Sequence, residues 1–251
     1  MYFFLSDLSF LDICYSSNSV PFILSSALRN YPTISYSSCY AQMVISLFLG
    51  MTECLLFAVM AYDRFIAISN PLHYTLIMNN HVCIQLAVVT WASAFLLAVI
   101  PITAIPANFC GHNLIKHFTC ETQALLKLIC AETPVRLILG LVIGIFILPL
   151  PFTFILISYT CIVVAVLKIH SAEASLKAFF TCGSHSPVFN VFYGTATYVY
   201  LKPQSRQYQD QDKVISAIYG AVTPMLNSLI YILRNKDKKD ALRKIIKRQE
   251  S

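Results

Sequence analysis

The apolar run from Val44 to Val59 constrains the fold of this chain more than any other stretch. Glu53 is its only formal charge, and the run is followed closely by the adjacent pair Asp63 and Arg64. Charged side chains are costly in hydrocarbon, so the pattern predicts a membrane-spanning helix with this pair at its water boundary. The alternative is that Arg64 only extends toward the lipid headgroups and has no further role.

The composition indicates an integral membrane protein. Of the 251 residues, 57% are hydrophobic and 12% are charged, whereas soluble domains carry about 25% charged residues. Apolar runs recur along the whole length, which predicts several spans rather than one anchor. The net charge of +6 does not indicate nucleic-acid binding, because eight of the 18 Lys and Arg residues lie between Arg234 and Arg248. A basic segment directly after an apolar run is typical of a cytoplasmic tail.

We predict an all-α bundle of six membrane spans, since about 20 helical residues cross the hydrocarbon. The basic tail, 234–251, belongs inside, which places the N-terminus and Asp63 inside and the long loop 106–133 outside. Apolar and basic residues separate onto two faces of the tail, which predicts an amphipathic surface helix; a solvated tail is the alternative. The spans are expected at about 2–27, 35–68, 82–105, 134–168, 176–201 and 213–233.

Four cysteines lie in or beside the loops assigned to the outside, where disulfides are stable. They allow three pairings, and their spacing does not choose among them. His112 and His117 lie among these cysteines, but the spacing fits no common zinc module and oxidised cysteines bind no metal, so we expect no metal site. The four residues are Cys39, Cys110, Cys120 and Cys130.

Three polar residues interrupt the apolar spans: Asp12, Glu53 and Asn227. Each would be costly against lipid, so each is expected to face the interior of the bundle. Asp12 and Glu53 could share a cation, a proton or waters there. A hydrogen-bonded cluster that only fixes helix packing explains the same residues equally well.

Several segments follow one another in a characteristic order. They are Met1–Cys14, Met60–Ser69 with Pro71–Tyr74, Ser158–Tyr159, Lys177–Phe179 with Thr181–Cys182 and Ser184–His185, Phe192–Thr195, and Pro224–Asn227 with Leu229–Tyr231 and Leu233–Asn235. Together these segments resemble the olfactory receptors, a branch of the rhodopsin-like G-protein-coupled receptors. Each motif is weak alone, but their order along nearly the whole chain is specific.

The resemblance implies a plasma-membrane receptor for small volatile odorants that signals through a stimulatory, cAMP-raising heterotrimeric G protein and is not an enzyme. It implies disulfides Cys39–Cys120 and Cys110–Cys130, and an interior polar or sodium site at Asp12, Glu53 and Asn227, sodium being the only cofactor that it allows. The implied G-protein switch is Asp63, Arg64, Tyr159 and Tyr231. The implied odorant contacts are mostly apolar, which suits a small volatile ligand. They are Ser46, Leu47, Gly50, Met51, Cys54, Ile143, Ile147, Tyr193, Ala196, Thr197 and Tyr200.

The chain departs from the family pattern at several places. Met1 coincides with an internal methionine of the family, so we expect the family's first helix to be missing and the N-terminus to lie on the inner side. Ser228 stands where a proline is usual, which should straighten the last span. Phe65 replaces a tyrosine, which is a mild change. The stretch before Lys177 lacks a basic residue and Phe180 replaces a serine, so contact with a G protein should be weaker.

Three other functions compete with a signalling receptor. A truncated, non-signalling relative retained in the endoplasmic reticulum would differ from it in surface staining. A six-helix transporter or channel could use Asp12 and Glu53, but the sequence shows no internal repeat and no ring of charges. A membrane enzyme has no support, because no nucleophile elbow, His-Glu-x-x-His motif or Gly-rich phosphate loop occurs.

Overall fold

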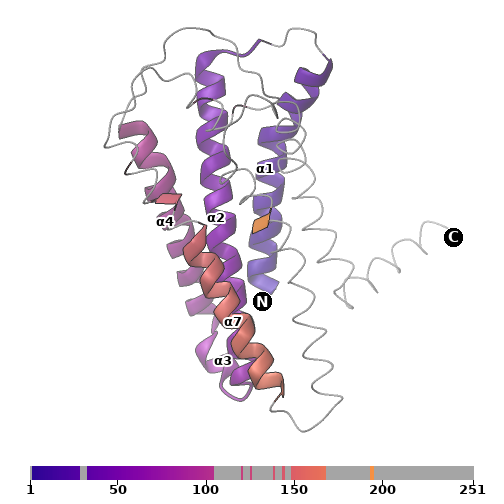
Figure 1. The fold of residues 1–251 in the computed structure, drawn as a ribbon, viewed down its shortest axis with the longest axis vertical. Coiled ribbons are helices and arrows are strands. Elements are labelled where there is room, and N and C mark those ends of the chain that lie inside the picture. The colour runs from indigo at the N-terminus through magenta and orange to yellow at the C-terminus, as the bar shows by residue number, and fades with distance from the viewer. Residues whose placement is uncertain are drawn as a thin grey trace, which may run out of the picture.

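The computed structural model describes residues 2–28, 33–104, 120, 125, 138, 143–144, 148–167 and 193–194. Within these ranges the regular structure is helical, and no strand occurs. The helices are α1 (Tyr2–Leu28), α2 (Tyr36–Ser69), α3 (Tyr74–Ile77), α4 (Asn80–Ala104) and α7 (Pro149–Leu167) (Figure 1).

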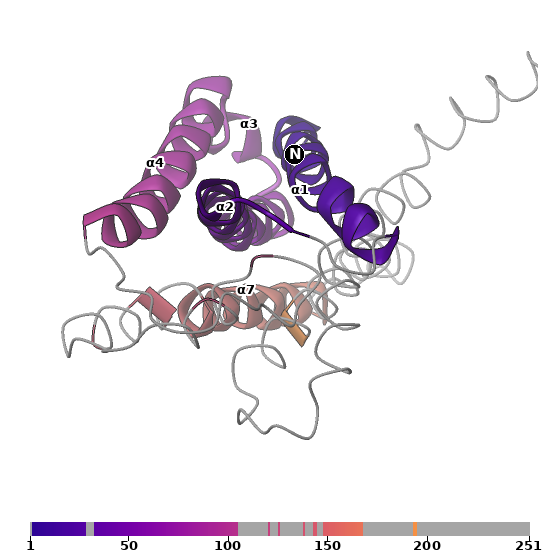
Figure 2. The ribbon, with the colours of Figure 1, turned by 90° about the horizontal axis from the view of Figure 1, so that it is seen from above.

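Helix α2 lies at the centre of the described bundle, with α1, α4 and α7 around it (Figure 2). It packs against each of these three helices, whereas α1 and α4 touch each other only sparsely. Its buried residues run from Cys39 near its start to Ile66 near its end. Because the neighbours share few contacts of their own, α2 fixes where each of them sits.

The largest buried cluster joins α1 to α2. Phe4 and Leu8 of α1 and Leu56 and Phe57 of α2 are almost completely buried in it. Lipid tails are as apolar as these side chains, so in a bilayer the contact is stabilised by close van der Waals packing rather than by exclusion of water.

Small residues line the face of α4 that meets α2. Ala94 and Ala98 are both fully buried and pack against Met51 of α2. Cys83 and Ala87 are buried earlier on the same helix at the same four-residue spacing. Small side chains at this spacing let two helix backbones approach closely, which explains how α4 packs on a helix with large apolar residues.

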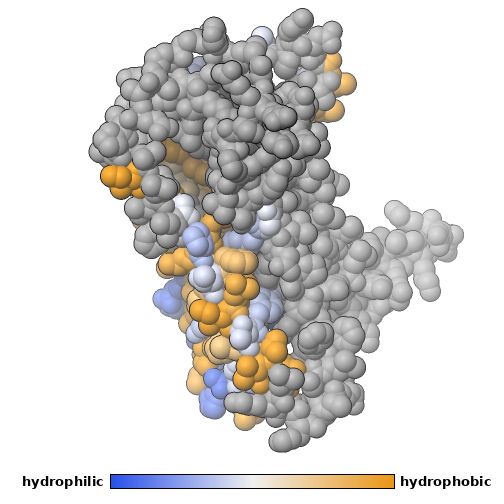
Figure 3. Space-filling model, in the orientation of Figure 1, coloured by the Kyte–Doolittle hydropathy of each residue, from blue (hydrophilic) through white to orange (hydrophobic). Residues whose placement is uncertain are grey.

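The outward faces of α4 and α7 are apolar. Apolar side chains cover much of the described surface in Figure 3. On α7 the exposed residues include Phe154, Leu156 and Ile157, and on α4 they include Val88 and Leu96. Faces of this composition suit contact with lipid.

Among the described residues, three helical segments are long and apolar enough to cross a membrane: Tyr36–Ser69, Asn80–Thr103 and Pro149–Val166. Helix α1 is also long enough but is not among them. It carries Asp7, Asp12 and several serines, and these lower its apolar character.

Side-chain caps and a proline set the ends of α2 and the start of α4. Ser35 Oγ accepts a hydrogen bond of 3.2 Å from the backbone N–H of Ser38 at the start of α2. Asn79 Oδ1 accepts one of 2.9 Å from the N–H of Val82 at the start of α4. Asn70 is the C-cap residue of α2, and Pro71, which follows it, disfavours helical backbone at Asn70.

The predicted all-helical fold with membrane-capable helices is confirmed within the described residues. α1, α2 and α4 occupy the ranges where spans were expected at 2–27, 35–68 and 82–105. α7 occupies the second half of the range 134–168. The remaining expectations lie outside the described residues, apart from a few single positions. These are the loop 106–133, the spans 176–201 and 213–233, and the tail 234–251 with its surface helix.

Candidate functional site

A disulfide joins the start of α2 to the stretch that follows α4. Cys39 and Cys120 are bonded, with a sequence separation of 81 residues. Both are buried, and they pack with Met43 and Leu125. This is one of the two pairs that the family resemblance implied. The other pair, Cys110 and Cys130, lies outside the described residues.

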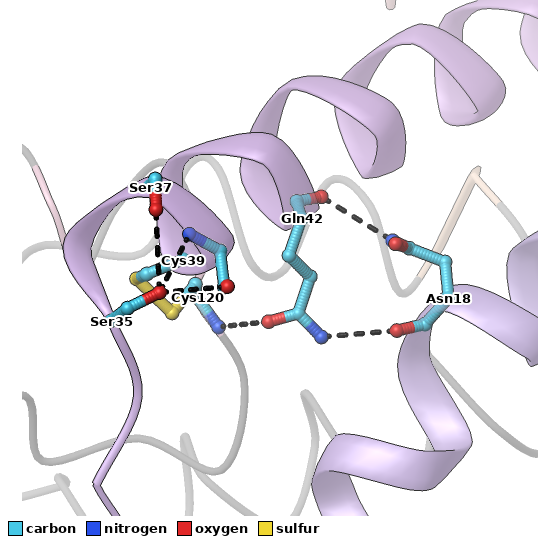
Figure 4. The surroundings of a disulfide bond; sticks show 7 residues. Asn18, Ser35, Ser37, Cys39, Gln42 and Cys120 are labelled. Atoms are coloured by element: carbon cyan, nitrogen blue, oxygen red, sulfur yellow. Dashed lines mark hydrogen bonds between the residues drawn. A yellow bond between two sulfur atoms is a disulfide. The ribbon is translucent and has the colours of Figure 1, made fainter.

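A polar network lies beside this disulfide (Figure 4). Gln42 Nε2 donates to the backbone carbonyl of Asn18 over 3.1 Å, and Gln42 Oε1 accepts from the N–H of Cys120 over 3.3 Å. Asn18 Nδ2 donates in return to the carbonyl of Gln42 over 3.3 Å and to Ser46 Oγ over 2.8 Å. The network therefore links α1, α2 and the disulfide-bonded residue Cys120.

Several of the expected odorant-contact residues lie together around α2. Leu47 and Ile143 are half-buried next to the buried Met51, against the alanines of α4. The phenol of Tyr193 is buried and donates to the carbonyl of Cys54 over 3.3 Å. Tyr193 also contacts the ring of Phe152, with 5.2 Å between the ring centroids.

The remaining expected contacts fall into two groups. Ser46 and Gly50 are half-buried on α2. Four others lie outside the described residues: Ile147, Ala196, Thr197 and Tyr200.

Two acids are buried in the interior of the bundle. Asp12 of α1 and Glu53 of α2 are each 5% exposed. Asn227, the third member expected at this polar site, lies outside the described residues. Within the described residues, no group of three or more His, Cys, Asp or Glu side chains is arranged to hold a metal ion. A cation here would therefore need backbone carbonyls, hydroxyls or waters in addition to carboxylate oxygens.

The acid of the Asp63–Arg64 pair is held by a tyrosine outside α2. Asp63 is 2% exposed, and its Oδ1 accepts a hydrogen bond of 2.8 Å from the hydroxyl of Tyr74 on α3. Burial, together with the Asp63 carboxylate, raises the pKa of Tyr74 to about 12. The phenol therefore stays protonated at neutral pH and remains a donor to Asp63.

Arg64 lies beside this contact and is half-buried. Its Nη2 is buried and has no hydrogen-bond partner among the described residues. Tyr159 of α7 packs near the same end of α2, in a cluster with Phe65 and Ile162. The structure thus brings together Asp63, Arg64 and Tyr159 at one end of the bundle, while Tyr231 lies outside the described residues.

One contact between α1 and α4 was not anticipated from the sequence. The indole Nε1 of Trp91 donates to both carboxylate oxygens of Asp7, over 3.2 and 3.3 Å. Phe48 and Phe10 pack around the indole ring. A buried indole N–H needs an acceptor, and this need is the one signal in the sequence that could have pointed to a polar partner on another helix.

The comparisons with known proteins decide the family. The model of a family described as "Olfactory receptor" matches residues 1–249. The chain belongs to the olfactory receptor family. It is 50% identical to human olfactory receptor 13H1 over 246 residues, which are 98% of this chain and 80% of that protein. It is 49% identical to human olfactory receptor 2K2 over 247 residues, 98% of this chain and 78% of that protein.

Membership of the olfactory receptor family settles the broad character of the chain. Members are receptors rather than enzymes, as the sequence predicted. The apolar helices and the family together indicate a multi-pass membrane protein with a helix bundle of the G-protein-coupled-receptor type.

Proposed function

We propose that this olfactory receptor binds small volatile odorants at the plasma membrane and signals through a stimulatory, cAMP-raising heterotrimeric G protein. The observation that carries the proposal is the continuity of α2. One helix of 34 residues bears Ser46, Gly50 and Met51 in its first half and Asp63–Arg64 near its end. From Gly50 to Asp63 the rise is about 20 Å, so one rigid element connects the odorant residues to the switch.

A ligand acts on such a receptor only if it binds two arrangements of the helices with different affinity. The contact between Tyr193 and the Cys54 carbonyl gives it a point of action, because it joins a distant part of the chain to α2 beside the expected odorant residues. A ligand that displaces or tightens this contact changes the position of α2 relative to its neighbours. Since α2 packs against three helices, the change reaches all of them.

At the other end of α2, the buried Asp63 is tied to Tyr74, whereas Arg64 Nη2 has no such partner among the described residues. Arg64 is therefore the member of the pair that is available for a new contact when the helices move. We assign it the contact with the G protein, with Tyr159 as the neighbour that repacks.

The interior acids are proposed to form a sodium site. Carboxylate oxygens are ligands that hard cations prefer, and Asp12 and Glu53 supply them from two packed helices. A bound cation would neutralise the cost of holding two buried acids within the membrane.

The test of the proposed function is Arg64→Ala in cells that carry a cAMP reporter, exposed to a broad set of volatile compounds. We expect odorant-evoked cAMP to be lost while staining of intact cells for a tagged receptor stays at the wild-type level. His81→Ala, a change at an exposed residue near the same end of the bundle, is the control and should signal normally. Full signalling by Arg64→Ala would contradict the proposed switch.

A further inference from the structure

The hydroxyl group of Ser46 differs from other hydroxyl groups on the helices. Thr52, Thr90 and Ser93 each donate to the backbone carbonyl four residues earlier, over 2.7 to 2.8 Å. Ser46 only accepts a hydrogen bond, from Asn18 Nδ2. A serine hydroxyl has one hydrogen to donate, and within the described residues the hydrogen of Ser46 has no acceptor.

The direction of the hydrogen bonds that lead to Ser46 is fixed by backbone groups. Gln42 Oε1 faces the N–H of Cys120, which can only donate. Gln42 Nε2 faces the carbonyl of Asn18, which can only accept. The side-chain amide of Gln42 therefore has one orientation, and exchanging its oxygen and nitrogen would place like groups against each other.

The same reasoning fixes Asn18. Its Nδ2 lies 3.3 Å from the carbonyl of Gln42, which again can only accept. The nitrogen therefore also faces Ser46 Oγ and donates to it. This carbonyl is the one to which Ser46 would otherwise donate, four residues back along α2. Asn18 Nδ2 thus donates to the backbone carbonyl that Ser46 would normally use as its acceptor, and also to a lone pair of the Ser46 oxygen.

We propose that Asn18 is a positioning residue that commits the Ser46 hydroxyl to donate to the ligand. The ligand class that follows carries a hydrogen-bond acceptor oxygen, as aldehydes, ketones and esters do, and a plain hydrocarbon is excluded from strong binding. This inference rests on the proposed odorant-binding role of α2. It adds that α1, through Asn18, determines the polarity of the ligand.

Asn18→Leu removes the donor to Ser46 with little change in size. The Gln42 carbonyl then loses its bond from Asn18 Nδ2, so the Ser46 hydroxyl can donate to that carbonyl, as the other helical hydroxyls do, and present its lone pairs elsewhere. The probes are a homologous series of straight-chain methyl ketones with the matching esters, alcohols and alkanes, read by cAMP. Asn18→Leu should raise the half-maximal concentration of the ketones about fivefold or more and leave the alcohols, which can donate, little changed.

Ser46→Ala is a second, independent variant, which removes the donor and does not introduce a charge. It should raise the half-maximal concentration of ketones and esters about fivefold and have little effect on alkanes. Ser93→Ala is the matched control, because that serine donates to the Val89 carbonyl and should leave all responses unchanged. If Asn18→Leu fails to reach the surface, Ser46→Ala still decides whether the Ser46 hydroxyl donates to the ligand.

Any of the following results would overturn the inference and leave the proposed function standing. One is a wild-type receptor that responds to alkanes as well as to ketones. The other is ketone responses that Ser46→Ala does not weaken. A receptor that responds to other volatile compounds but to no compound with an acceptor oxygen counts in the same way. A receptor present at the surface that responds to no volatile compound at all overturns both proposals.

Discussion

Removing the disulfide between Cys39 and Cys120 should destabilise the receptor by several kcal/mol. The bond closes a loop with a sequence separation of 81 residues, for which the chain-entropy model gives about 4.5 kcal/mol. Membrane spans that stay inserted already restrict the unfolded chain, which reduces the entropy that the bond removes. We therefore expect about 2–4 kcal/mol, the range typical of disulfides.

The assay is thermal unfolding of the purified receptor in detergent, followed by the fluorescence of the only tryptophan, Trp91. Cys39→Ala, Cys120→Ala and the double variant should each lower the midpoint by about 5–10 °C. The three variants should agree with one another, since removing either sulfur breaks the same bond. Dithiothreitol should lower the wild-type midpoint by at least as much, because it also reduces the second disulfide that the family resemblance implies.

Cys161→Ala is the control, because Cys161 is a free, exposed cysteine whose loss should leave the midpoint unchanged. Additive effects of the two single variants would show that the cysteines stabilise the receptor separately rather than through a bond. A wild-type midpoint that dithiothreitol does not change would refute the reasoning as well.

Three further predictions concern contacts between helices. Thermal unfolding of the purified receptor measures each, followed by far-ultraviolet circular dichroism because one of the variants lacks Trp91. Tyr74→Phe removes the donor to the buried Asp63 and should cost about 1.5–3 kcal/mol at neutral pH. Folding raises the pKa of Tyr74 from its usual value near 10 to about 12. The stability that wild type gains over Tyr74→Phe should therefore be complete below pH ~10 and disappear as the pH rises through ~12. A stability difference that does not change with pH in this window would argue against the hydrogen bond. Trp91→Phe removes the donor to Asp7 and should lower the stability by about 1 kcal/mol. Adding Asp7→Leu should recover part of that loss, so a double variant less stable than Trp91→Phe alone would be inconsistent with this contact. Ala98→Leu should lower the stability by about 1–3 kcal/mol because the larger side chain has no space against α2. Ala92→Leu, on the exposed side of α4, should be neutral. Equal effects of the two variants would contradict the close approach of α4 to α2.

The helical membrane fold could be predicted from the sequence because apolar runs of this length are typical of membrane-spanning helices. The run from Val44 to Val59 lies wholly inside α2, and Asn70 and Pro71 end that helix where the apolar pattern ends. These signals are local, so one chain is enough to interpret them. The pairing of Cys39 with Cys120, by contrast, came from the family resemblance, because spacing alone left three pairings open.

The contacts that shape the candidate site could not be predicted, because each joins residues far apart in sequence. Asn18 and Gln42 are ordinary polar residues in their own segments, and only the packing of α1 on α2 brings them together. Tyr74 lies in a short connection, and nothing in its neighbourhood indicates that Asp63 is its acceptor. Side-chain hydrogen bonds depend on helix rotation and register, which hydrophobic patterns define only coarsely.

The length of α2 has a consequence for the membranes in which the receptor can reside. Its 34 residues extend about 50 Å, whereas the hydrocarbon core is about 30 Å thick. Tilting within the usual range of roughly 0–40° cannot hide the excess, so part of the helix must emerge from the hydrocarbon. Thickening of the bilayer, as sterols produce, would then cover more of the emerging turns instead of stretching the protein. We expect hydrophobic mismatch to exert little strain on this helix as the receptor passes from thinner to thicker membranes.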